Sequence, residues 1–103
     1  MDRIEKLKAF LEQNPADSFV QHALALEYIK MNREEEARAE FEALLGRDEK
    51  YVGSYYHLAK LLERQGEREK AIACYEKGME VARELKDNHA YNELQAGYED
   101  LTY

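Results

Sequence analysis

Two histidines and one glutamate, His22, His57 and Glu63, form the candidate metal site of this sequence. The histidines are far apart in the sequence, so they would meet only if the fold placed two separate helices side by side. A zinc site needs three or four such ligands at fixed positions. No further ligand follows either histidine at a helical spacing of four residues. We therefore expect neither a metal nor another cofactor.

The single cysteine, Cys74, is the strongest nucleophile in the chain. It has no Cys-x-x-Cys partner and no obvious His and Asp companions, which a catalytic or redox thiol would use. The sequence also lacks a glycine-rich phosphate loop and a His-Glu-x-x-His pair. The many carboxylates are ordinary solubilising charge on a helical protein. These observations predict a protein that is not an enzyme.

Composition narrows the class of protein further. The chain has 103 residues, of which 45% are hydrophobic and 36% charged, with one proline and no tryptophan. This composition is typical of one soluble, strongly helical domain. The net charge of −7 is spread over the whole length, which disfavours nucleic acid and anionic membranes as partners. No apolar stretch is long enough for a signal core or a membrane span, and one cysteine cannot form an intrachain disulfide, so we expect a cytoplasmic protein.

Apolar residues at intervals of three and four predict six helices. Several breaks separate them: Asn14-Pro15, where the residue before proline leaves the helical region; Gly46 and Gly66, which favour helix ends; and Asp87-Asn88, which offers an N-cap. Asp17 or Ser18 is expected to cap the second helix. The predicted helices cover about 2–13, 18–31, 34–45, 51–65, 67–85 and 88–101.

A repeat runs through the chain with a fixed period of about 34 residues. Ala25, Ala37 and Phe41 recur as Ala59, Ala71 and Tyr75. A period of this length is typical of a stacked helical array, in which each unit buries its apolar face only against its neighbours. Small alanines let the two helices of a unit approach closely, and an aromatic ring fills the space beside them.

This pattern resembles the tetratricopeptide repeat, in which Leu-Gly-x-x-Tyr is followed by an alanine and, four residues later, an aromatic. The corresponding segments are Leu24-Ala25-x-x-Tyr28 and Leu58-Ala59-x-x-Leu62. The resemblance implies an all-α fold of antiparallel helix pairs, stacked as a short right-handed α-solenoid. It divides the single domain 1–103 into a half repeat (1–17), two full repeats (18–51 and 52–85) and a capping helix (86–103).

The sequence departs from the family pattern at a few positions. The early aromatic of the motif is present as Tyr55 in the second repeat, but Gln21 takes its place in the first. The motif glycine is Ala25 or Ala59, and Glu49 and Arg83 stand where a closing proline is usual. These departures leave the pattern intact and affect mainly the angle between repeats.

In this family the first helix of each pair lines an inner, concave surface, across which a peptide or a partner helix lies. The matching segments here are residues 18–31 and 52–65. The first of them is apolar on two sides, so its second stripe needs a cover of protein or ligand. The family's carboxylate clamp uses Lys, Asn and Arg, a set that this chain does not reproduce. The predicted partner-binding residues are Phe19, His22, Leu26, Ile29, Tyr56, His57 and Lys60.

The resemblance thus implies a non-enzymatic interaction module for a peptide or helix, with an unidentified protein as partner. A second interpretation, self-association, remains open. Residues 1–17 would be a half repeat without its own partner helix. A second copy of the chain could cover its apolar residues, Ile4, Leu7, Phe10 and Leu11, or the apolar inner stripe of residues 18–31, forming a homodimer. At the other end, the stripe Tyr91, Leu94, Tyr98 and Leu101 is expected to bury one face of a capping helix against the helix that contains Met79, Val81 and Ala82.

Overall fold

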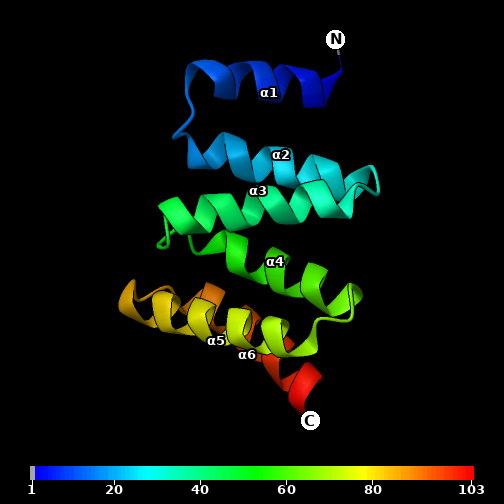
Figure 1. The fold of residues 1–103 in the computed structure, drawn as a ribbon. Helices are drawn as coiled ribbons and strands as arrows, with labels where there is room; N and C mark the ends of the chain where they lie inside the picture. Colours follow the sequence, from blue (N-terminus) through cyan, green and yellow to red (C-terminus); the bar gives the residue numbers. More distant parts are fainter. Residues whose placement is uncertain (1) are drawn as a thin grey trace. The chain divides into compact units, whose positions relative to one another are not determined.

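The computed structural model describes residues 2–103, which form six helices and no strand. They divide into two compact units. The N-terminal unit ends at Asp48, and the C-terminal unit spans Glu49–Tyr103. Within the units, neighbouring helices along the chain run antiparallel (Figure 1). The helices are α1 (Arg3–Gln13), α2 (Ser18–Lys30), α3 (Glu34–Arg47), α4 (Gly53–Arg64), α5 (Arg68–Glu84) and α6 (Asn88–Thr102).

Aspartates begin three of the helices. The carboxylate of Asp2 accepts a hydrogen bond from the backbone N–H of Glu5, that of Asp17 from Val20, and that of Asp87 from Ala90. Each bond satisfies one of the amides that the first turn of a helix leaves without a partner. The expected caps of α2 and α6 are therefore confirmed, with Asp17 rather than Ser18 as the cap of α2.

Three helix ends share one geometry, a residue in the left-handed conformation. These residues are Asn32 (φ 59°), Gly66 (φ 77°) and Lys86 (φ 58°). The residue after each of them donates its backbone N–H to the carbonyl five residues earlier, as Arg33 does to Tyr28 at 2.8 Å. This pattern is the Schellman motif. The expected helix end at Gly66 is confirmed. The expected end at Gly46 is wrong, because α3 continues through this residue to Arg47.

The N-terminal unit is built on α2, which packs against both α1 and α3. Leu24, Ala25 and Tyr28 on α2 are buried together with Ala37 and Phe41 on α3. Ala25 and Ala37 are completely buried, as expected for two helices that approach closely at these alanines. Helix α1 contributes one buried residue, Ile4, so most of its surface remains accessible.

The C-terminal unit is a three-helix arrangement in which α5 packs on α4 and α6, and α4 also contacts α6. Two glycines allow these contacts. A Cβ atom added at Gly78 would lie 2.7 Å from the Cβ of Tyr55, and one at Gly97 would lie 2.6 Å from the ring of Tyr75. On α6, Leu94 and Gly97 are buried. Tyr91, Tyr98 and Leu101, expected to share that buried face, are only half-buried.

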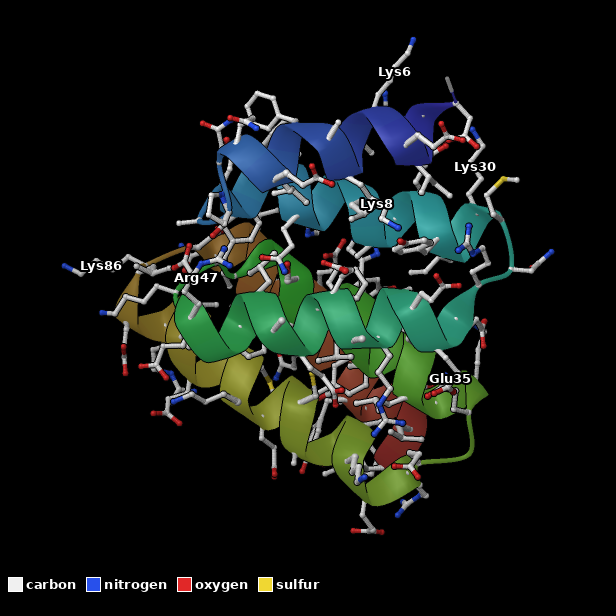
Figure 2. The ribbon with its side chains drawn as sticks, turned by 45° about the horizontal axis from the view of Figure 1, so that its top comes forward. Lys6, Lys8, Lys30, Glu35, Arg47 and Lys86 are labelled. Atoms are coloured by element: carbon white, nitrogen blue, oxygen red, sulfur yellow. The ribbon has the colours of Figure 1, made fainter. Side chains whose placement is uncertain are left out.

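Gln21, which stands where the family pattern has an aromatic, belongs to a network of polar side chains. Arg47, at the end of α3 (Figure 2), donates to the side-chain oxygen of Gln21 at 2.7 Å, to Ser18 Oγ at 2.8 Å and to the carbonyl of Pro15 at 3.5 Å. In the second repeat Tyr55, the equivalent of Gln21, donates its hydroxyl to the carbonyl of Glu49 at 2.7 Å. Pro15 and Glu49 occupy equivalent positions of the repeat, so the same carbonyl accepts a side-chain hydrogen bond in both units.

Candidate functional site

In the N-terminal unit, the predicted partner-binding residues form a stripe along α2. Phe19 is 74% exposed, which is unusual for a large apolar side chain. His22, Leu26 and Ile29 are half-buried. The ring of His22 meets Phe41 edge-on, with ring centroids 5.6 Å apart. This stripe therefore combines an exposed aromatic anchor with apolar side chains that are already held in place.

In the C-terminal unit, Tyr56 and Lys60 belong to a cluster that also contains Glu63 and Tyr75. The ammonium of Lys60 lies 5.7 Å from the centroid of the Tyr56 ring and 3.6 Å from the Glu63 carboxylate. Tyr75 donates its hydroxyl to the same carboxylate. Residues 56, 60 and 63 share one face of α4, because they are spaced by four and three residues. The cluster offers a cation, an aromatic ring and a half-buried carboxylate side by side.

The hydroxyl of Tyr75 remains protonated over a wide pH range. Burial is the main reason that its pKa is raised far above the ordinary value of 10.0, and the hydrogen bond to Glu63 adds to the effect. The side chain is fully buried, so ionisation would place a phenolate next to a carboxylate in an apolar setting. Tyr75 thus acts as a fixed hydrogen-bond donor that orients Glu63.

His57 lies next to Tyr56 on α4, and charged groups of both α4 and α6 act on it. Burial lowers its pKa below the ordinary value of 6.5, while Glu93 on α6 raises it and Arg64 lowers it by smaller amounts. Its ring meets that of Tyr56 edge-on at 5.8 Å. His57 is therefore a half-buried imidazole that favours the neutral form, placed where α4 meets α6.

The residues that the structure describes do not form a metal site. Across residues 2–103, no group of three or more His, Cys, Asp or Glu side chains is arranged to hold a metal ion. His22 belongs to the N-terminal unit, whereas His57 and Glu63 belong to the other. The thiol of Cys74 lies 3.4 Å from the carbonyl of Tyr55. None of the helices in this range is both long and apolar enough to cross a bilayer.

Two cavities are lined by residues outside the predicted partner-binding set. One, of about 290 Å³, lies in the N-terminal unit beside Gln21 and is bordered by α1, α2 and α3. The other, of about 560 Å³, lies where α5 ends and α6 begins, and it is lined by Arg83, Lys86, Asn88 and Tyr91. None of the predicted partner-binding residues lines either cavity. The one signal in the sequence is Gln21 in the place of an aromatic, since the smaller side chain leaves volume unfilled at the first cavity.

Comparison with known proteins agrees with the geometry. A tetratricopeptide repeat domain protein from Salinibacter ruber is 42% identical, covering 84% of this chain and 96% of its own, with a TM-score of 0.81. A protein from Bordetella parapertussis, solved in solution, is 26% identical, covering 99% of this chain and 89% of its own, with a TM-score of 0.84. The MamA protein shares the fold, with a TM-score of 0.74 at 24% identity, covering 93% of this chain and 51% of its own. No curated protein matches the sequence significantly.

The family assignment follows from the repeats themselves. The family model of the tetratricopeptide repeat matches residues 20–51 and 52–85, which cover α2 from its third residue and all of α3, α4 and α5. These two segments begin within two residues of the repeats expected from the sequence period. Domains of this kind are generally non-enzymatic modules for protein–protein interaction. The chain belongs to the tetratricopeptide repeat family.

Proposed function

We propose that this protein binds a peptide or a helix of a partner protein on the exposed faces of its first-of-pair helices, α2 and α4. The observation that carries the proposal is the stripe on α2, where Phe19 is 74% exposed beside the half-buried Leu26 and Ile29. A docking helix supplies apolar anchors at intervals of three, four and seven residues, which matches the spacing of this stripe. Its single cysteine is consistent with action in a reducing cytoplasm.

The cluster on α4 gives the proposed partner a chemical preference. Lys60 is held over the Tyr56 ring and next to Glu63, so it offers a positioned ammonium beside an aromatic surface. A peptide with an acidic residue near an apolar one would pair with this arrangement. His57 takes part through its ring packing on Tyr56 and not as a metal ligand.

Substitutions on α2 test the proposal. Phe19→Glu changes an exposed side chain, so it should leave the fold intact while it places a charge in the stripe. Leu26→Glu does the same at a half-buried position and needs a circular-dichroism check of folding. Binding of peptides from a library should weaken about tenfold or more in both variants. If both folded variants retain every peptide that the wild type binds, the surface is wrong.

A second candidate function is self-association through α1. Phe10 is 45% exposed on this helix, and Leu7 and Leu11 are only half-buried. Isologous pairing of two copies would cover these side chains. Sedimentation equilibrium at micromolar concentration distinguishes the two candidates: a dimer that Phe10→Glu dissociates supports self-association, whereas a single 12.1 kDa species excludes it.

A further inference from the structure

We infer that the turn between α5 and α6 is a binding site for an oxyanion group, a carboxylate or a phosphate, separate from the proposed surface on α2 and α4. The first observation is the lining of the cavity of about 560 Å³ at this turn. Its four lining residues are Arg83, Lys86, Asn88 and Tyr91, all of which can donate hydrogen bonds. None of them is acidic, although the chain as a whole carries 22 acidic and 15 basic residues.

The second observation is that one cation of the cavity is already oriented. Arg83 donates from Nη2 to the hydroxyl of Tyr91 at 3.0 Å, and its guanidinium carbon lies 5.3 Å from the centre of the same ring. The phenol oxygen accepts this bond, so its own O–H is left to donate to a ligand. A guanidinium fixed in this way offers its remaining N–H groups in a planar fork, the geometry that suits carboxylate and phosphate oxygens.

The nearest acidic side chains along the chain are engaged elsewhere. The carboxylate of Glu84 pairs with Lys50 at 3.7 Å. The carboxylate of Asp87 accepts the backbone N–H of Ala90 at 3.0 Å as the cap of α6. Neither lines the cavity. Both carboxylates therefore have partners outside the cavity, whose lining carries the positive charges of Arg83 and Lys86.

The third observation concerns how the fold creates this site. Helix α3 ends at Arg47, whose equivalent in the second repeat is Val81, but α5 continues past Val81 to Glu84. This extension brings Arg83 beside the first turns of α6. The turn that follows places Lys86 in the left-handed conformation, which is unfavourable for a side chain with a Cβ atom. Figure 2 shows the side chain of Lys86 directed away from the helices, and Lys86 is one of the residues that line the cavity.

The left-handed Lys86 makes a sharp test possible. Lys86→Gly removes the ammonium and also relieves the backbone, so its melting temperature should not fall below that of the wild type. A purely structural role for this residue predicts unchanged anion binding in that variant. A role in binding predicts weaker binding in a protein that is at least as stable.

The experiment titrates the ¹⁵N-labelled full chain, at constant ionic strength, with inorganic phosphate and separately with the capped peptide acetyl-Glu-Glu-Glu-amide. We expect saturable amide shifts confined to residues 83–91, and about tenfold weaker binding in Lys86→Gly and Arg83→Gln, as for a lost charge-assisted hydrogen bond. Lys70→Gln, on the same helix but outside the cavity, controls for net charge, and Phe19→Glu separates this site from the proposed peptide surface. Both controls should bind like the wild type.

The two ligands distinguish the sources of the oxyanion. If phosphate gives saturable shifts and the peptide does not, the site binds phosphate. If the peptide binds more tightly than phosphate, the site binds side-chain carboxylates. The inference is overturned if neither ligand gives saturable shifts at residues 83–91. It is also overturned if Lys86→Gly and Arg83→Gln bind as tightly as Lys70→Gln.

Discussion

At the residue scale, Tyr75 combines the roles of core side chain and polar anchor. Its place in the repeat predicted an aromatic packed beside Ala59 and Ala71, and its complete burial confirms this. Its hydrogen bond to Glu63 could not be predicted, because the two residues lie on different helices and no periodic pattern links them. The same holds for the close approach of its ring to Gly97.

Replacing Tyr75 by phenylalanine should measure this polar role. The ring would remain, while the donor to Glu63 would be lost, so we expect a loss of about 1.5–3 kcal/mol in the free energy of unfolding, as for a hydrogen bond to a charged group. Urea denaturation followed by circular dichroism measures the change. Tyr103→Phe, at a tyrosine that is 94% exposed, is the control and should have no effect. A Tyr75→Phe protein as stable as this control would contradict the assignment.

His57 should make the stability of the protein depend on pH. Burial lowers its pKa in the folded state, whereas the unfolded chain protonates near 6.5. Its contribution is therefore fully present above about pH 6.5 and is lost as the pH falls through the lower, folded-state pKa. Between pH 7.5 and 5.5 the wild type should lose stability faster than His57→Gln, by up to about 1.4 kcal/mol per pH unit.

Chemical denaturation at a series of pH values tests this dependence. His89→Gln, at an exposed histidine, is the matched control and should follow the wild type. Equal pH slopes for the wild type and His57→Gln would show that the imidazole is not desolvated as described.

At the scale of helices, the sequence predicted number and order but not every boundary. Capping aspartates and the left-handed Gly66 act through local chemistry, so they could be identified from neighbouring residues alone. The helix end predicted at Gly46 is wrong because a glycine only permits the left-handed conformation and does not require it. The length of α5 was predicted, by contrast, because its apolar residues continue at helical spacing to residue 85 and the structure ends the helix at Glu84.

Two glycines inside helices should respond in opposite directions to alanine. At Gly78 a new Cβ would lie 2.7 Å from the Cβ of Tyr55 and 3.0 Å from Leu94, so Gly78→Ala should destabilise the protein by about 1–3 kcal/mol. At Gly46 nothing lies within 4 Å of the new atom, so Gly46→Ala should stabilise it by about 0.5–1 kcal/mol. Thermal unfolding of both variants gives the sign. A stabilising Gly78→Ala would refute the close packing of α4, α5 and α6.

Helix α6 should be essential to the C-terminal unit. It buries Leu94 and Gly97 against the rest of that unit, and arrays of this kind need a cap over their last apolar face. Deleting residues 88–103 removes the buried Leu94, worth about 1.5–3 kcal/mol, and the half-buried Tyr91, Tyr98 and Leu101, against a total stability of about 5–15 kcal/mol. The truncated chain should unfold or aggregate in a circular-dichroism melt and on gel filtration. If it stays soluble and melts like the full chain, α6 is instead an arm for binding a partner.

At the scale of the whole molecule, the repeat determines the packing and leaves the partner undetermined. The positions that recur from one repeat to the next are buried alanines and aromatics, whereas the proposed contact residues differ between repeats, as in His22 against Tyr56. A periodic pattern therefore predicts which face of a helix is internal but not what the exposed face binds. The α5–α6 cavity could not be predicted from the repeat, because it lies where the second repeat departs from the first.

The central claim is that the exposed face of α2 binds a peptide or helix of a partner protein. The most direct measurement is the affinity of library-selected peptides for the wild type, Phe19→Glu and Ala43→Glu, with folding verified by circular dichroism. Ala43 is exposed on α3, so its variant adds the same charge on the other helix of the pair. We predict about tenfold or greater weakening in Phe19→Glu and unchanged affinity in Ala43→Glu. Equal affinities in all three proteins would contradict it.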